Sequence, residues 1–375
     1  MNEIHPLLDK EKQLQARRYE KECRLLGLAG AVLSLIILAV FYFCGLSGWL
    51  AHLGLGHSII WTFLIYVVSF QMILVILGLP LSFYTGYIHE HKWKFSNHTV
   101  KSWFWEQIKS FLVALILMFI ILGLLFWIMA LFPHDWWLIA GLVFAFVGVV
   151  MATLFPVVIL PIFNTYTPVQ NEVLTDALER ILKEGGLRSS GFFEEDMSRQ
   201  TKKENAFLAG LGKTRRVILS DNLMGNMSVP EVESVIAHEV GHFRYRHIWK
   251  NLLIGTLQGL VVFYILNWAM RLFSPQFLSS PRWNMSLFPV FVFLFGVISL
   301  FLFGSLSNAL SRHFEKQADR YALKAIRDKK AFMTAMAGLA DRNLSNAYPE
   351  WWVKFLYYSH PPIGERLEMA EEFHE

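Results

Sequence analysis

Six long apolar segments constrain the fold of this chain more than any other feature. Each is close to or longer than the about 20 residues that a helix needs to cross the hydrocarbon core of a bilayer. They span residues 28–50, 59–84, 111–132, 136–163, 252–273 and 287–310. Charged residues make up only 17% of the 375 residues, less than the about 25% of a typical soluble protein. We therefore predict a mainly α, polytopic membrane protein with about six transmembrane helices.

The basic residues alternate along the chain with these segments. Of the 34 Lys and Arg residues, 6, 4, 12 and 10 lie in segments 1–27, 85–110, 164–251 and 311–375, whereas the short connection 51–58 has none. Because cytoplasmic loops carry the excess of Lys and Arg, we expect both termini and segments 164–251 and 311–375 to be cytoplasmic. The net charge of +4 then reflects topology, so we expect the lipid bilayer as a partner and no nucleic acid.

The apolar segments divide the chain into five parts. In order, these are a cytosolic N-terminal segment (1–27), four transmembrane helices with an interfacial loop at 85–110 (28–163), the first part of a catalytic domain (164–250), transmembrane helices five and six (251–310), and the second part of the catalytic domain (311–375). Pro156 and Pro161 remove backbone donors near the end of the fourth span, which a membrane tolerates where neighbours or a cavity satisfy the freed carbonyls. We therefore expect an internal cavity near that end.

The segment His238-Glu239-Val240-Gly241-His242 indicates a metal site. At 3.6 residues per helical turn, His238 and His242 share one face and can reach the same ion. Glu239 lies beside them and can take a proton from the attacking water, as the H-E-x-x-H motif requires. The apolar run 235–237 favours a packed helix over a surface helix with two solvated histidines. Ser228 and Glu231 predict the start of this helix as a capping box, and we expect it to continue through Arg246 into the fifth span.

Two further segments carry candidate site residues. Glu315 and Asp319 are four residues apart on a predicted helix and share a face. They are either solvated residues with i,i+4 ion pairs, or a third zinc ligand, Glu315, with Asp319 orienting a ligating imidazole. His360 precedes two prolines and is either a loop histidine or a rigidly aimed imidazole that stabilises an oxyanion.

Two short apolar stretches, 205–210 and 216–219, precede the metal helix and predict a small β-hairpin. Between them, the fragment 212–214 is similar to the end of a phosphate-binding loop, but Phe207 stands where that motif needs its first glycine, so we expect no nucleotide. The two cysteines, Cys23 and Cys44, predict neither a disulfide framework nor a zinc–thiolate site.

Together these motifs resemble the M48 zinc metallopeptidases, and most closely their CAAX prenyl protease 1 (Ste24-like) branch. The resemblance is carried by segments 238–242, 311–319 and 359–362, and further by 204–207 and 161–168. It implies a helical membrane barrel around an intramembrane chamber, with a cytosol-facing, zincin-type catalytic domain. The chain has six apparent spans, whereas the well-known eukaryotic members have seven.

The resemblance also implies a role for each matching residue. One Zn²⁺ ion per chain would be bound by His238, His242 and Glu315, with Glu239 as general base and acid. The other implied roles are stabilisation of the intermediate by His360, support of the site by Asp319 and Arg366, and substrate binding by Asn205, Ala206 and Phe207.

The expected function is that of an integral-membrane zinc metalloendopeptidase. Its substrate would be a peptide or protein, either a prenylated C-terminal CAAX-type peptide or another hydrophobic peptide. Two alternatives share the same residues: an HtpX-like protease for membrane-protein quality control, and a non-catalytic chamber or scaffold protein with a zinc site.

Overall fold

The computed structural model describes residues 4–53, 58–210 and 215–374. Its first part contains α1 (Lys10–Phe43), α2 (Leu46–His52), α3 (Ile59–Phe83), the π-helix η1 (Tyr84–His89), α4 (Glu90–Lys92), α5 (Val100–Leu131), α6 (Trp136–Leu154), the π-helix η2 (Phe155–Ile159) and α7 (Leu160–Phe163). The middle contains β1 (Tyr166–Pro168), α8 (Glu172–Glu184), β2 (Phe192–Glu195), the 3-10 helix η3 (Met197–Arg199), β3 (Ala206–Ala209), β4 (Arg216–Ser220), α9 (Asp221–Asn226) and α10 (Val229–Arg244). The last part contains α11 (His247–Phe273), α12 (Pro281–Ser286), α13 (Phe288–Ser299), the π-helix η5 (Leu300–Gly304), α14 (Ser305–Ile326), α15 (Lys329–Arg342), α16 (Trp351–Tyr357) and α17 (Ile363–Glu371).

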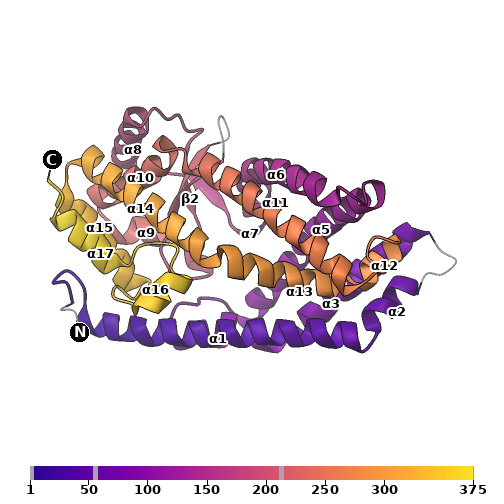
Figure 1. Cartoon of the computed structure of the whole chain (residues 1–375). Coiled ribbons are helices and arrows are strands. Elements are labelled where there is room, and N and C mark those ends of the chain that lie inside the picture. Colours follow the sequence, from indigo (N-terminus) through magenta and orange to yellow (C-terminus); the bar gives the residue numbers. More distant parts are fainter. Residues whose placement is uncertain (1–3, 54–57, 211–214, 375) are drawn as a thin grey trace.

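Among the described residues, six helical stretches are long and apolar enough to cross a membrane, which confirms the expected number of spans. They are residues 10–43, 59–92, 100–131, 136–163, 247–273 and 288–326. Figure 1 shows α3, α5, α6 and α13 toward one end of the molecule and α8, α15 and α17 at the other, where both termini also lie. Residues near the two ends are in contact there, since Nε2 of His5 is 3.0 Å from Oε1 of Glu371.

The loop expected at 85–110 is wrong as secondary structure, because most of this segment is helical, whereas its place at the membrane interface stays a prediction. The helix that begins as α3 continues through η1 and α4 to Lys92, and α5 starts at Val100. Thr99 caps α5, its Oγ1 accepting a hydrogen bond from the Ser102 N–H at 3.1 Å. Glu22 of α1 holds the polar end of this helix at Lys92. Its carboxylate accepts hydrogen bonds from Lys92 Nζ at 2.7 Å and from Trp93 Nε1 at 2.9 Å. These contacts are between distant segments, so the local pattern did not reveal them.

The fourth span keeps its helical course through both prolines as α6, η2 and α7. An apolar cavity of about 520 Å³ lies between α5, α6, α11 and α13, and is lined by Gly141, Phe144 and Gly148 of α6. Residues 156 and 161 do not line it, so this cavity runs beside the middle of α6 and not at the proline-containing end where we expected one. Gly141 allows the close approach of α11, since a Cβ there would be 2.4 Å from a Leu260 side-chain atom.

The predicted β-hairpin is present as β3 and β4, which pair antiparallel with Phe207 opposite Ile218. Its turn, with the phosphate-loop-like fragment 212–214, lies outside the described residues. The hairpin belongs to a four-stranded sheet of order β1-β2-β4-β3, in which β2 and β4 run parallel. Strands β1 and β2 were not predicted, because β1 has only three residues and the Phe-Phe-Glu-Glu sequence of β2 does not alternate between apolar and polar residues. As a result of this order, β3 is an edge strand.

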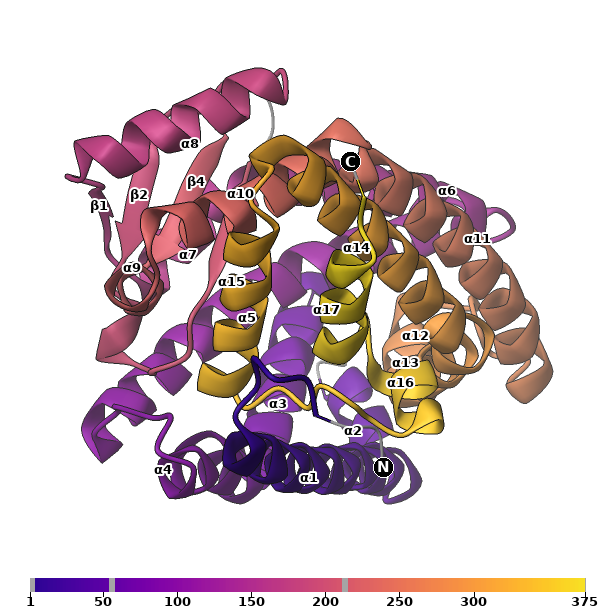
Figure 2. The same cartoon turned by 90° about the vertical axis from the view of Figure 1, so that its left-hand side faces the viewer.

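Three helices pack beside the sheet and form the core of the catalytic part. Figure 2 shows α8 above the strands and α10 and α15 beside them. The core is built from residues such as Leu178, Leu219, Ile236 and Phe332, each fully buried. Gly241 lets α10 cross α14 at very short range, because a Cβ there would be 2.9 Å from the Ala318 Cα. This crossing brings the polar residues of α14 against those of α10.

The metal helix does not continue into the fifth span, which corrects our expectation. Helix α10 ends at Arg244, and α11 begins at His247. Between them Arg246 adopts a left-handed conformation, with φ 57° and ψ 36°. Because a non-glycine residue rarely takes this conformation, the chain changes direction sharply here, and His247 turns back toward α10.

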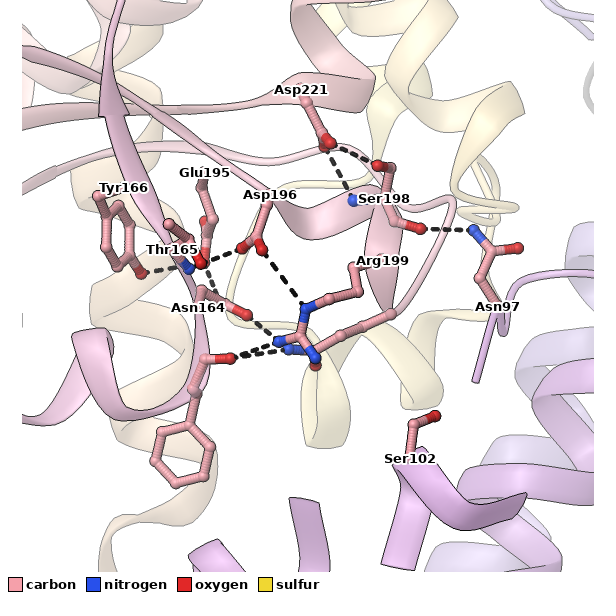
Figure 3. Close-up of polar contacts among 12 residues, drawn as sticks. Asn97, Ser102, Asn164, Thr165, Tyr166, Glu195, Asp196, Ser198, Arg199 and Asp221 are labelled. Carbon is pink, nitrogen blue, oxygen red and sulfur yellow. Dashed lines mark hydrogen bonds and ion pairs between the residues drawn. The ribbon is translucent and has the colours of Figure 1, made fainter. Parts of the chain in front are cut away.

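A polar cluster joins the fourth span to the catalytic part (Figure 3). We call Asn164, Tyr166, Glu195, Asp196 and Arg199 the junction cluster. Glu195 accepts hydrogen bonds from the Asn164 amide and from the Tyr166 hydroxyl, the latter at 3.1 Å. Arg199 donates to the Phe163 carbonyl at 2.7 Å and pairs with Asp196 at 3.4 Å. The cluster therefore fixes the end of α7 to β2 and η3.

Candidate metal centre

Helix α10 presents His238 and His242 side by side, as predicted. The predicted capping box is confirmed, with the Ser228 N–H donating to the Glu231 carboxylate at 2.8 Å. The two Nε2 atoms of His238 and His242 are 3.1 Å apart. Both rings therefore direct the same nitrogen to one point.

Glu315 of α14 completes this point from the opposite side. Its Oε2 is 3.1 Å from His238 Nε2, and its Oε1 is 3.3 Å from His242 Nε2. The ligand atoms of these three residues all lie within 4.8 Å of one another, and His238 and Glu315 are buried. Two imidazole nitrogens and one carboxylate oxygen are a ligand set of catalytic zinc sites, which keep a fourth position open.

The donor and acceptor properties of these atoms fit a bound cation. His238 Nδ1 lies 2.7 Å from Asp319 Oδ1 and must donate its proton there, so the Nε2 of a neutral His238 offers a lone pair. That lone pair faces Glu315, whose Oε2 is buried and has no hydrogen-bond partner among the described residues. Although burial opposes protonation, Asp319 and Glu315 together raise the pKa of His238 to about 9. The negative charge of the same two carboxylates also favours a metal ion at this point.

Asp319 is fully buried and holds both His238 and Arg366. Arg366 Nε donates to Asp319 Oδ2 at 2.9 Å, and its Nη2 donates to Oδ1 at 2.5 Å. Arg366 therefore pairs with a buried carboxylate beside the metal ligands. The alternative of a solvated helix with i,i+4 ion pairs is wrong for Asp319, because α14 faces α10 and not solvent.

Two further residues border the ligands. Glu239 is half-buried and lies between two cavities, one of about 230 Å³ and one of about 290 Å³. His360 lines both cavities, and its Nε2 is 3.3 Å from Glu315 Oε1. Both side chains therefore stand where a substrate bound in these cavities would meet the metal ligands.

Strand β3 forms one wall of the same space. Asn205 and Ala206 line the smaller cavity, and Leu208 lines the larger one. Phe207 is not among the residues that line these two cavities, because successive side chains of a strand point to opposite faces. Of the three residues expected to bind substrate, Asn205 and Ala206 thus line the site and Phe207 does not.

Sequence reasoning missed His247, whose Nδ1 is 3.0 Å from His242 Nδ1. It lies five residues after His242, which on a continuous helix is a rotation of about 140° away from the ligand face. Only the break at Arg246 brings it back. Arg215, which lines the larger cavity, was also missed, since a single arginine beside a strand carries no motif.

Comparisons with known proteins agree with this site. Residues 168–374 match the family model described as peptidase family M48, and residues 2–165 match the one described as CAAX prenyl protease N-terminal, five membrane helices. The chain belongs to peptidase family M48. It is an integral-membrane metalloendopeptidase, and because M48 peptidases are zinc-dependent, zinc is the metal that the family implies. Within residues 2–165 the described part of this M48 peptidase has four candidate spans, one fewer than that description.

Curated relatives of this M48 peptidase include CAAX prenyl proteases. CAAX prenyl protease 1 of Saccharomyces cerevisiae is 32% identical over 311 residues, 78% of this chain and 68% of the relative. The human CAAX prenyl protease 1 homolog is 26% identical over 367 residues, 87% and 76% of the two chains. The uncharacterized metalloprotease YhfN of Bacillus subtilis is 28% identical over 311 residues, 82% and 72% of the two chains. These relatives favour neither the HtpX-like nor the non-catalytic alternative.

A solved structure has the same fold. The crystal structure of S. mikatae Ste24p matches with a TM-score of 0.85, over 98% of this chain and 92% of that chain. The two sequences are 24% identical. The arrangement of spans, sheet and catalytic helices described above is therefore the fold of that protein.

Proposed function

We propose that this M48 peptidase uses one zinc ion to cleave hydrophobic C-terminal peptides of the prenylated CAAX type at the cytoplasmic face of its membrane. The observation that carries the proposal is the convergence of His238, His242 and Glu315 on one point beside Glu239. The names of the CAAX prenyl proteases among the relatives support the substrate class. The cytoplasmic side is supported by the excess of Lys and Arg in the segments that flank the spans on that side.

The residues have distinct roles in this proposal. A bound zinc ion would acidify a water molecule and polarise the scissile carbonyl. Glu239 accepts the proton of the attacking water and returns it to the leaving amine. His360 donates a hydrogen bond to the oxyanion of the tetrahedral intermediate. Asp319 holds His238 in the tautomer whose Nε2 is free, and Arg366 holds Asp319.

The free edge of strand β3 is where the substrate backbone would bind. As an edge strand, β3 has main-chain groups that no further strand of the described sheet uses. We infer that the peptide lies extended along Asn205, Ala206 and Phe207 and pairs with them by strand addition, which needs the main chain of Phe207 but not its side chain.

The test uses purified protein and matched C-terminal peptides, one farnesylated and one unmodified. We expect zinc-dependent cleavage that a chelator stops and added zinc restores, with a higher kcat/KM for the farnesylated peptide. Equal kcat/KM values for both peptides would remove the prenyl preference and leave the peptidase. Cleavage that survives chelation would contradict the zinc site itself.

A further inference from the structure

His247 is a buried imidazole in direct contact with a metal ligand but without a place in the mechanism above. It is 2% exposed and begins α11, directly after the left-handed residue Arg246. Its ring stacks on that of Phe314 of α14, with 4.4 Å between the ring centroids and 15° between the planes. Helix α14 therefore holds the plane of this ring in place.

A chain of hydrogen bonds runs from His242 through His247 to the surface. The Nδ1 atoms of His242 and His247 are 3.0 Å apart. His247 Nε2 lies 2.9 Å from Gln317 Oε1, and Gln317 Nε2 lies 3.0 Å from His313 Nε2. Apart from Gln317, every member of the chain is an imidazole.

The chain has one direction that is compatible with metal binding. If His242 binds the ion through Nε2, its Nδ1 carries the ring proton and must donate it. His247 Nδ1 then accepts this hydrogen bond. The ring proton of His247 is therefore on Nε2, which donates a hydrogen bond to Gln317 Oε1. The Gln317 amide in turn donates to His313 Nε2. The oxygen of Gln317 faces His247 and its nitrogen faces His313, which is the orientation that this direction needs.

We propose that His247 is a positioning residue that fixes the tautomer and the aim of the zinc ligand His242, and that Gln317 and Phe314 fix His247. This rests on the zinc site of the proposed function. Each ligand imidazole would then have its own support: His238 has the carboxylate of Asp319, and His242 has a neutral imidazole. The strained backbone at Arg246 has a purpose in this arrangement, because a continuous helix would carry His247 away from His242.

The experiment measures zinc affinity by competition with a chromophoric chelator and the visible spectrum of the cobalt-substituted protein. His247→Phe keeps an aromatic ring that can stack on Phe314 but removes the acceptor. We expect its zinc dissociation constant to rise about 10- to 100-fold and its cobalt spectrum to shift. His247→Asn, whose side-chain oxygen can stand near the position of Nδ1, should recover part of the affinity. His134→Phe, in the turn between α5 and α6, is the matched control and should bind zinc like the wild type.

The outcomes separate the two proposals. Wild-type zinc affinity and an unchanged cobalt spectrum in His247→Phe would overturn the role of His247 and leave the zinc peptidase intact. A wild-type protein that binds no zinc would overturn the proposed function as well. If His247→Phe does not fold, Gln317→Leu tests the same chain from its far side: a weaker zinc affinity supports the role of His247, and an unchanged one overturns it.

Discussion

The metal centre and the junction cluster contain the same kinds of buried acid but use them in opposite ways. Glu315 and Glu195 are each 5% exposed. Glu195 faces an amide N–H and a hydroxyl, which are donors in every protonation state near neutral pH. Glu315 faces the Nε2 atoms of His238 and His242, which present lone pairs when Nδ1 of each ring carries the proton, so that a cation is needed between them and the carboxylate. A buried acid surrounded by lone pairs indicates a cation site, whereas one surrounded by fixed donors indicates a structural joint.

At the junction cluster, the effect of burial on Glu195 is larger than that of its hydrogen bonds. Burial raises the pKa of Glu195, and the hydrogen bonds from Tyr166 and Asn164 offset this only in part. In the metal centre, the buried carboxylate of Asp319 pairs with the positive charge of Arg366. The Asp319 carboxylate in turn raises the pKa of Arg366. Asp319 and Arg366 of the metal centre therefore stay charged, whereas the junction cluster connects the end of α7 to β2 and η3.

The largest effect that would separate the two regions is expected at Glu239. Replacing it by Gln removes the proton acceptor and leaves the three ligands in place, so kcat should fall by about 10³-fold or more while zinc content stays near one per chain. Metal analysis and peptide hydrolysis on the same sample check this. Glu233→Gln, on the same helix, should keep full activity. Substantial turnover in Glu239→Gln would rule out its role as base.

Loss of Glu315 should convert the metal centre into an incomplete site. Glu315→Ala leaves two imidazoles, so we expect zinc affinity to fall by more than about 100-fold, beyond the loss seen for partners outside the ligand set. Chelator competition measures it, with Glu179→Ala on α8 as the control. Near-normal affinity in Glu315→Ala would show that another residue is the third ligand.

Replacing Asp319 tests whether the negative charge next to His238 Nδ1 affects zinc binding. Asp319→Asn keeps the shape of the side chain but removes the charge that faces Arg366, so zinc affinity should fall about 10- to 100-fold and the protein should become less stable, since Arg366 is left buried without a counter-charge. Asp176→Asn, exposed on α8, is the control. Unchanged affinity would mean that packing alone orients His238.

The junction should respond least, and with a characteristic pH dependence. Because its folded pKa is raised, Glu195 favours the folded state below about pH 4.3, its unfolded value, and this contribution is lost as the pH rises through the folded value. Glu195→Gln should therefore melt about 1–2 °C above the wild type at pH 8, with a smaller difference at pH 5. Glu195→Ala should melt several degrees lower, because Asn164 and Tyr166 lose their acceptor. An equal fall in melting temperature for Glu195→Gln and Glu195→Ala at pH 8 would contradict this account of Glu195.

Local patterns were sufficient for the features that depend on neighbouring residues. Apolar length predicted the six spans, since helices in lipid must satisfy their own backbone groups. The four-residue spacing of His238 and His242 predicted their common face, and Ser228 with Glu231 predicted where α10 begins. The same patterns failed at 85–110, where Glu22 of a distant helix keeps a polar segment helical.

The sequence by itself determined that this chain lies in a membrane, has two imidazoles and a carboxylate on one helix, and resembles M48 peptidases. The tertiary structure alone decided that α10 and α14 meet at Gly241, so that Glu315 joins the two histidines and Asp319 is enclosed with Arg366. It also decided that the chain breaks at Arg246 and returns His247 to His242. These contacts join residues on different helices, and their energy comes from burial and from donors meeting acceptors in space, which the spacing of residues along one helix does not encode.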